Sequence, residues 1–152
     1  DLNHLRAIHR HLFQDVYEWA GEVRTVELNK GGQQFQFRRY IETGKADVHK
    51  RLADANFLKG LSRADFAGQA ARIAGDVNYV HPFREGNGRT QLFYLEQLAG
   101  QASHPLDLAR IAPERWIEAS RLSHKGDYAA MSQEIGRACE SYGRGRRFRA
   151  FL

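Results

Sequence analysis

The stretch HPFREGNGRT, residues 81–90, separates two segments with helical apolar spacing and decides how the chain folds around it. Pro82 has no amide hydrogen and disfavours helical backbone at His81, so the preceding helix should end there. Gly86 and Gly88 provide a turn that can lead directly into another helix. The sequence therefore predicts a short loop between two helices, with a histidine at the junction.

The two helices on either side of this loop have recognisable boundaries. Ser62, followed three residues later by an acidic residue, resembles a capping box at the start of the first helix. Apolar residues then recur at helical spacing and predict a central position for this helix: Phe66, Ala70, Ile73, Ala74 and Val77. The second helix is predicted to begin at Asn87 or Arg89, to continue to Leu98 and to stop at Gly100.

The rest of the chain predicts further helices and one hairpin. Asp1 can cap a first helix, and Gly21 closes the turn after it. Residues 24–37 alternate around turn glycines and predict a β-hairpin, which must lean on a helical body because two strands alone are marginally stable in water. More helices are predicted at residues 41–58, 113–122 and 127–142. The expected fold class is all-α, a helical bundle with a small β-hairpin.

The composition fits one folded domain of 152 residues with 42% hydrophobic side chains. The single cysteine, Cys139, excludes an intrachain disulfide and a zinc site of paired thiolates. No apolar run approaches the roughly 20 residues that span a bilayer, so no membrane partner is expected. The chain begins with Asp1 instead of methionine, which suggests an excised or processed piece.

The net charge of +5 includes a cluster of arginines in the tail GRGRRFRAFL, residues 143–152. A basic patch can bind nucleic acid, but no nucleic-acid-binding motif accompanies this one. We interpret the tail as a solvated segment or a junction to a missing segment, and we expect no nucleic-acid partner.

The loop and the start of the second helix suit an anion. A glycine-rich turn leading into a helix presents unpaired backbone N–H groups and the positive end of the helix dipole. Glycine lets a phosphate approach the backbone, and an asparagine side chain adds an amide donor. The residues of this candidate cradle are Gly86, Asn87 and Gly88. Arg89, on the first turn of the helix, adds a fork of donors for phosphate oxygens.

Three neighbouring side chains extend the candidate site. Mg²⁺ prefers one or two carboxylates with phosphate oxygens and water, so Glu85 is the candidate metal ligand. An imidazole titrating near neutrality can remove a proton from an attacking hydroxyl, which makes His81 a candidate base, whereas Phe83 is expected to point into the core. Each feature also has a purely structural interpretation. The histidine beside proline can be structural, the GNG segment can be an ordinary turn, and Glu85 and Arg89 can form an i, i+4 ion pair. The combination favours a functional site.

The residues HPFREGNGR match the signature of the Fic (filamentation induced by cAMP) domain family, HxFx(D/E)GNGRxxR, at every specified position up to the first arginine. Residues 4–32 resemble the first helices and the flap hairpin of that family, and the resemblance extends to about Leu122. It implies a single domain at 1–152, with a core at about 1–122 and a C-terminal helix and basic tail at 123–152. The implied activity is transfer of AMP from ATP to a hydroxyl of a target protein.

The resemblance also assigns roles to residues. It makes His81 the general base for a tyrosine, serine or threonine hydroxyl of the target, and it makes Glu85 the ligand of Mg²⁺. Residues 86–88 would cradle the α- and β-phosphates, and Arg89 would stabilise the departing pyrophosphate. The flap would align an extended target segment by strand addition and would place two residues near the nucleotide, Lys30 and Gly31.

One position departs from the family signature. Its last arginine falls on Leu92, which cannot contact a phosphate. Leucine can serve as one more core residue, or its presence can mean weaker ATP binding, a different donor or a different mode of restraint. The family's inhibitory sequence, (S/T)xxxE(G/N), is absent from these 152 residues. Inhibition is therefore expected from a small separate antitoxin protein or from residues ahead of Asp1.

The expected function is that of a magnesium-dependent protein adenylyltransferase, with toxin-like relatives in the family. The expected location is the bacterial cytoplasm or, after export, a host cell. Two alternatives stay open. One is transfer of another nucleotidyl or phosphate-containing group, although relatives that do so change the GNG segment that this chain retains. The other is a module that binds a nucleotide without turnover, for which the basic tail is the only independent support.

Overall fold

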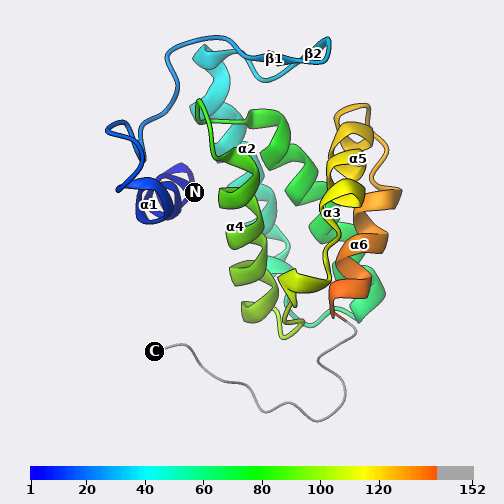
Figure 1. Cartoon of the computed structure of the whole chain (residues 1–152). Helices are drawn as coiled ribbons and strands as arrows, with labels where there is room; N and C mark the ends of the chain where they lie inside the picture. Colours follow the sequence, from blue (N-terminus) through cyan, green and yellow to red (C-terminus); the bar gives the residue numbers. More distant parts are fainter. Residues whose placement is uncertain (140–152) are drawn as a thin grey trace.

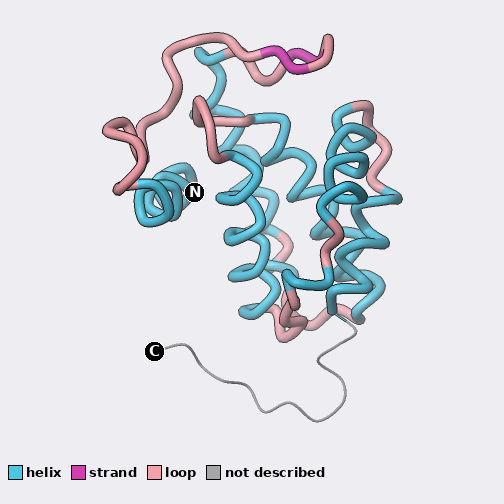
Figure 2. Tube along the Cα trace, viewed as in Figure 1, coloured by secondary structure: helices cyan, strands magenta, loops and turns pink. Residues whose placement is uncertain are grey.

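The computed structural model describes residues 1–139, which form six α-helices and a two-stranded sheet (Figures 1 and 2). The α-helices are α1 (Leu2–Phe13), α2 (Ile41–Asp54), α3 (Arg63–Val80), α4 (Asn87–Gln101), α5 (Pro113–His124) and α6 (Ala129–Cys139). The strands β1 (Asn29–Lys30) and β2 (Gln33–Gln34) pair antiparallel, with Asn29 opposite Gln34 and Lys30 opposite Gln33. Three short 3-10 helices connect these elements: η1 (Arg38–Tyr40), η2 (Asn56–Leu58) and η3 (Leu108–Arg110). The expected all-α class with a small hairpin is confirmed.

Helix α3 occupies the centre of the bundle. It contacts α2, α4, α5 and α6, whereas α1 lies at one side against α4 and α2 (Figure 1). The hairpin crosses the end of the bundle where α3 finishes and α4 begins. Its flanks therefore lie beside the loop that joins these two helices.

The sequence of α3 explains its central position. Phe66 is fully buried at its start, and the predicted cap is formed, since the Ser62 hydroxyl accepts a hydrogen bond from the Asp65 N–H. Further along the helix, a Cβ on Gly75 would lie 2.6 Å from Cε1 of Tyr128. Only glycine allows that approach, and small residues predominate elsewhere on the buried surface, among them Ala67, Ala70, Ala71 and Ala74.

The hairpin is much shorter than predicted. The paired strands cover only two residues each, at 29–30 and 33–34, instead of extending through 24–37. Directly beyond the strands the Phe35 N–H still donates to the Leu28 carbonyl at 3.2 Å, but the residues farther out bond to the helical body. The Arg24 N–H donates to the Pro82 carbonyl at 2.9 Å, and the Gln36 N–H donates to the Tyr79 carbonyl at 3.0 Å.

Several helix boundaries also differ from the prediction. The helix expected at 41–58 ends at Asp54 and is followed by η2, in which the backbone adopts positive φ. Helix α4 continues through Gly100, and the left-handed turn falls instead on Ser103, with φ of 64°. The last helix begins at Ala129, where the Asp127 carboxylate caps the first N–H. Its predicted end at Tyr142 and the basic tail lie outside the described residues.

Helix α6 is part of the same core as the preceding helices. Met131 and Ile135 are buried in the same apolar cluster as the core residues of α3. Within the described part of the chain, every helix is too short or too polar to serve as a membrane span.

Candidate active site

The loop begins where α3 ends, as the sequence predicts. His81 ends the helix, because its backbone is left-handed, with φ of 47° and ψ of 63°. Its N–H makes the last helical hydrogen bond, to the Val77 carbonyl at 3.1 Å. Left-handed backbone costs a residue other than glycine roughly 1–2 kcal/mol. Such strain persists where the surroundings hold it in place, which is common at functional sites.

The Asn87 side chain closes the loop from inside. Its Oδ1 accepts from the Phe83 N–H at 2.9 Å, and its Nδ2 donates to the Phe83 carbonyl at 2.6 Å. Asn87 and Phe83 are both buried, and Phe83 points into the core as predicted. One hydrogen of the Asn87 amide therefore serves the loop, and donation of the other to an anion stays a prediction.

The two glycines of the loop differ in what they permit. Gly86 has φ of 80°, and a Cβ there would lie 2.5 Å from Cε2 of Phe13 in α1. Gly86 is thus required by backbone conformation and by packing. A Cβ on Gly88 would meet no atom within 4 Å, so this glycine faces open space. Open space beside the unpaired N–H groups of a helix start is what an anion needs.

His9 of α1 also holds the loop in place, and the sequence analysis did not identify it. Its Nδ1 accepts from the Gly21 N–H at 2.9 Å, so Nε2 carries the proton and donates to the Glu85 carbonyl at 2.8 Å. The ring is fully buried and stacks on Phe83 with 4.0 Å between ring centroids. Burial lowers the pKa of His9, which keeps the imidazole neutral for this bridging role. A histidine at helical spacing in an apolar stripe is the only signal the sequence offers.

The His81 imidazole has one nitrogen committed and one free. Its Nδ1 lies 3.1 Å from the Asn78 carbonyl oxygen, which makes Nδ1 the donor and leaves Nε2 without a proton. The ring stacks on Phe35 of the hairpin flank, with centroids 3.8 Å apart and planes 9° apart. The tautomer with a free Nε2 lone pair is the one a proton acceptor requires.

Burial lowers the pKa of His81 to about 4, because a desolvated imidazolium is disfavoured. The hydrogen bond to Asn78 opposes this shift, and the positive charges of Arg24 and Lys30 add to it. The ring is therefore neutral at pH 7.

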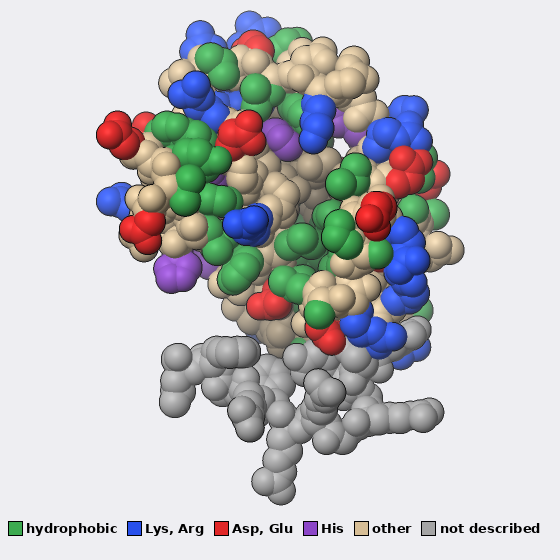
Figure 3. All heavy atoms as spheres, viewed as in Figure 1, with side chains coloured by type: hydrophobic (Ala, Val, Ile, Leu, Met, Phe, Trp, Pro, Cys, Tyr) green, Lys and Arg blue, Asp and Glu red, His purple; other side chains and the backbone are tan. Residues whose placement is uncertain are grey.

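A cavity of about 630 Å³ lies between the hairpin tip, the loop and α5. Four predicted site residues meet in its lining: His81, Gly88, Lys30 and Gly31. Trp116 of α5 supplies an apolar wall, and Arg121 adds a cation that two hydrogen bonds tie to Glu118. On the face shown in Figure 3, the surface below the hairpin is hollowed, with histidine and Lys or Arg side chains beside the hollow.

The other predicted residues lie outside this lining. Glu85 and Arg89 are exposed, and the Arg89 guanidinium lies 5.7 Å from the ring centroid of Phe13, on the side of α1. The Glu85 carboxylate forms no hydrogen bond or ion pair among residues 1–139, so the alternative i, i+4 ion pair with Arg89 is not present. Glu85 is thus free to bind a ligand.

Residues 1–139 contain no group of three or more His, Cys, Asp or Glu side chains that could hold a metal ion by themselves. A free, exposed carboxylate at Glu85 nevertheless fits the donor set of Mg²⁺, which takes one or two carboxylates and completes its shell with phosphate oxygens and water. In its donor chemistry Glu85 therefore suits Mg²⁺, and its carboxylate lies outside the lining of the cavity.

Helix α4 contributes one cavity residue that sequence reasoning missed. Gln91 follows Gly88 by three positions and so lies on the same face of the helix. It is 7% exposed, it lines the cavity, and its Nε2 has no hydrogen-bond partner among the described residues. Leu92, the position that departs from the family signature, is partly buried and packs against the apolar core.

Known proteins resemble this chain in sequence over most of its length. The Fic/DOC family profile matches residues 1–99. The chain is 42% identical over 138 residues to "Probable protein adenylyltransferase y4lH" of Sinorhizobium fredii, covering 90% of this chain and 72% of that protein. It is 39% identical to "Protein adenylyltransferase VbhT" of Bartonella schoenbuchensis, covering 90% of this chain and 29% of that protein. The names of these relatives bear out the expected nucleotidyltransferase class.

Solved structures resemble the fold over most of its length. The BepC protein of Bartonella tribocorum, a VirB-translocated effector with bound AMPPNP, gives a TM-score of 0.82 at 28% identity and covers 91% of this chain and 73% of that chain. The N-terminal Fic domain of a putative cell filamentation protein of Bartonella quintana, with bound ADP, gives 0.83 at 30% identity and covers 91% and 72%. On the profile match, the identities and the predicted signature together, the chain belongs to the Fic/DOC family.

Proposed function

We propose that the chain transfers AMP from ATP to a hydroxyl side chain of a target protein, with His81 as general base. The observation that carries the proposal is the state of that imidazole. It is neutral, it donates through Nδ1 to Asn78, and it borders a cavity that also contains the start of α4 at Gly88. The relatives named protein adenylyltransferases support the same activity.

The reaction requires a balanced displacement at the α-phosphorus. The target hydroxyl oxygen bonds to the α-phosphorus, the bond from that phosphorus to the oxygen bridging to the β-phosphate breaks, and pyrophosphate leaves. His81 accepts the hydroxyl proton at Nε2. Backbone N–H groups of residues 87–89, at the positive end of α4, stabilise the phosphate charge. Because the protein forms no covalent bond itself, its contribution is positioning and charge stabilisation.

Other residues support binding in this proposal. The walls formed by Trp116 and Phe35 suit the base of a nucleotide, and Lys30 offers a cation at the mouth of the cavity. Glu85 would hold Mg²⁺, which when bound neutralises phosphate charge. Arg89 reaches the leaving pyrophosphate only after a change of rotamer, because its guanidinium now lies over Phe13.

The leucine at position 92 should affect binding of the nucleotide donor more than the transfer step itself. Leu92 packs against the core and gives the far end of a triphosphate no cation. Lys30, Arg121 and Lys125 are the cavity cations that can replace one. An inhibitory glutamate, whether from a separate antitoxin or from another segment, would likewise find no arginine at this position.

Labelled nucleotides test the proposal. The protein is incubated with Mg²⁺ and extracts of bacterial and of eukaryotic cells, with ATP labelled at the α-phosphate in one series and at the γ-phosphate in another. A protein band labelled only in the α series is expected. His81→Ala should reduce that label at least about 100-fold, and His11→Ala, an exposed histidine on α1, should not.

The same experiment separates the alternatives. Label from the γ series would indicate phosphate transfer instead. Absence of label in both series, with ATP binding still measurable by calorimetry, would favour a non-catalytic nucleotide-binding module.

A further inference from the structure

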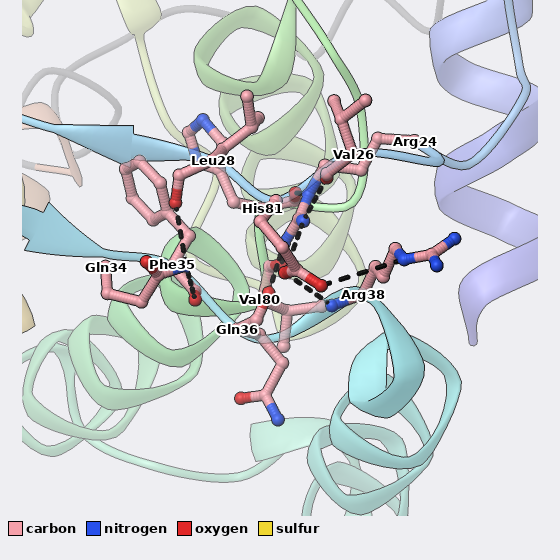
Figure 4. A network of polar contacts seen from close by, with 10 residues as sticks. Arg24, Val26, Leu28, Gln34, Phe35, Gln36, Arg38, Val80 and His81 are labelled. Carbon is pink, nitrogen blue, oxygen red and sulfur yellow. Dashed lines mark hydrogen bonds and ion pairs between the residues drawn. The ribbon is translucent and has the colours of Figure 1, made fainter.

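Arg24 is a buried cation that joins the two flanks of the hairpin. Its side chain is 0% exposed, and its guanidinium donates through Nη1 to the Val26 carbonyl at 2.8 Å and through Nη2 to the Gln36 carbonyl (Figure 4). Val26 precedes β1 and Gln36 follows β2, so one side chain fixes the spacing of the two flanks. This matters because strands of two residues each cannot hold a hairpin in place alone.

The same guanidinium also binds the end of α3 and the loop. Its Nε donates to the His81 carbonyl at 2.7 Å and its Nη2 to the Val80 carbonyl at 3.3 Å, while the Arg24 N–H donates to Pro82 at 2.9 Å. The His81 carbonyl belongs to the residue with left-handed backbone. Arg24 therefore contacts the backbone of the candidate base and the hairpin above it at once (Figure 4).

The chemistry of these contacts explains why arginine stands here. A buried cation is costly unless hydrogen bonds satisfy it, and carbonyl oxygens from separate segments converge on this one. Its ion pair with Glu27 is long, at 3.7 Å, and Glu27 is half exposed. Only the planar five-donor fork of arginine can serve these carbonyls together, since a lysine ammonium has three donors and no fixed plane.

We propose that Arg24 is a positioning residue, which holds the His81 backbone and the hairpin flanks so that the imidazole stays stacked against Phe35 at the cavity. The catalytic part of this inference rests on the proposed role of His81 as base. Arg24 is not among the residues that line the cavity, whereas Gly88 at the start of α4 is. Its loss should therefore impair the chemical step and leave nucleotide binding nearly intact.

Hydrogen exchange without any substrate tests the structural part. In Arg24→Met and Arg24→Lys, the backbone amides of Phe35 and Gln36 should exchange about tenfold faster or more than in the unaltered protein, while amides of α6 should not change. The matched control is Arg38→Met, which removes an exposed arginine that lies 3.7 Å from the same Glu27. Unaltered exchange in both Arg24 variants would overturn the proposal.

Kinetics test the catalytic part. Both Arg24 variants should lower kcat for nucleotide transfer about 10- to 100-fold, the penalty of a displaced reacting group, with KM for ATP changed less than about threefold. Glu27→Gln, which keeps every guanidinium–carbonyl bond, and Arg38→Met should behave like the unaltered protein. A rise in KM alone, or an equal loss of kcat in Arg38→Met, would overturn the proposal.

The pH profile distinguishes positioning from a loss of folded protein. Arg24→Met removes a positive charge that lowers the pKa of His81, so the acid limb of the kcat/KM profile should move to higher pH. Arg24→Lys keeps the charge and should move it less. A smaller folded fraction would not move this limb, and melting curves measure that fraction directly.

If Arg24→Met does not fold, hydrogen exchange and kcat of Arg24→Lys support or overturn the proposal. If the unaltered protein transfers no nucleotide, the proposed function fails, whereas hydrogen exchange still decides whether Arg24 holds the flanks.

Discussion

Replacing Lys45 with methionine should stabilise the protein at pH 7. Lys45, on α2, is fully buried, and its Nζ has no hydrogen-bond partner among residues 1–139. The ring of Tyr94 compensates in part, with its centroid 4.7 Å from Nζ. Burial lowers the pKa of Lys45 from 10.5 to about 8. Methionine has a similar length, adapts to irregular spaces and carries no charge, so it should fill the same position without this penalty.

The magnitude follows from the shifted pKa. A difference of roughly 2.5 units, at 1.36 kcal/mol per unit, gives about 3 kcal/mol as the cost of keeping the Lys45 ammonium charged at pH 7. Methionine loses the attraction of the ammonium to the Tyr94 ring, about 1–2 kcal/mol. The expected net gain in the free energy of unfolding is therefore about 1–2 kcal/mol, or roughly 2–4 °C of Tm per kcal/mol.

The pH dependence identifies the cause. Between pH 8 and 10.5 the unfolded chain holds the Lys45 proton and the folded chain releases it, so the stability of the unaltered protein should rise with pH across this window. Lys45→Met should lack that rise. Burial raises the pKa of Tyr94 to about 12, which lowers stability above about pH 10 in both proteins and cancels in their difference. Urea unfolding at pH 7, 8, 9 and 10 measures the effect. A methionine variant less stable at pH 7, or equal slopes in both proteins, would refute the reasoning.

Three further predictions address the site. Gly86→Ala should lower the free energy of unfolding by about 2–4 kcal/mol, because it combines left-handed backbone with a clash against Phe13. Gly88→Ala should change the free energy of unfolding by less than about 1 kcal/mol yet still impair transfer. Equal melting temperatures for the two variants would contradict this. Leu92→Arg should tighten binding of ATP relative to ADP by about tenfold in calorimetry, the value of a charged hydrogen bond to the extra phosphate, and an unchanged ratio would count against the cavity as the triphosphate site. Since His81 must be deprotonated to act and its pKa is about 4, kcat/KM should be level from about pH 5 to 7 and fall only near pH 4, whereas an inflection near 6.5 would show that the ring is not desolvated.

Local signals made much of the fold predictable. The cap at Ser62 and the proline after His81 act on neighbouring residues, so both ends of α3 follow from the sequence. The hairpin could not be predicted in length, because its flanks bond to carbonyls of Tyr79 and Pro82, which are distant in the chain. Glycine at position 100 suggests a helix end, yet Ser103 adopts the left-handed turn. Which residue after a helix takes that conformation depends on the packing of the segment that follows.

The part of the cavity lining that comes from consecutive residues of the loop was predictable from the sequence. His81 and Gly88 do border one cavity, and the hairpin tip brings Lys30 to it. Phe35, which stacks on the imidazole, and Arg24, which binds its backbone, were not identified because apolar and cationic side chains in a hairpin have many other uses. Their roles depend on where the hairpin lies on the bundle, which periodicity does not specify.

The consecutive residues of the loop divide into two sets with different duties. Three residues face inward. Phe83 and Asn87 are buried, and the Asn87 side chain bonds to the backbone N–H and carbonyl of Phe83, while Gly86 leaves room for the Phe13 ring. His81 and Gly88 face the cavity. A substitution in the first set should lower activity by distorting the loop, and its effect would resemble the loss of a ligand contact. Activity alone therefore cannot assign a residue of this loop to the nucleotide, and only variants whose melting temperature is unchanged can show which side chains meet the substrate.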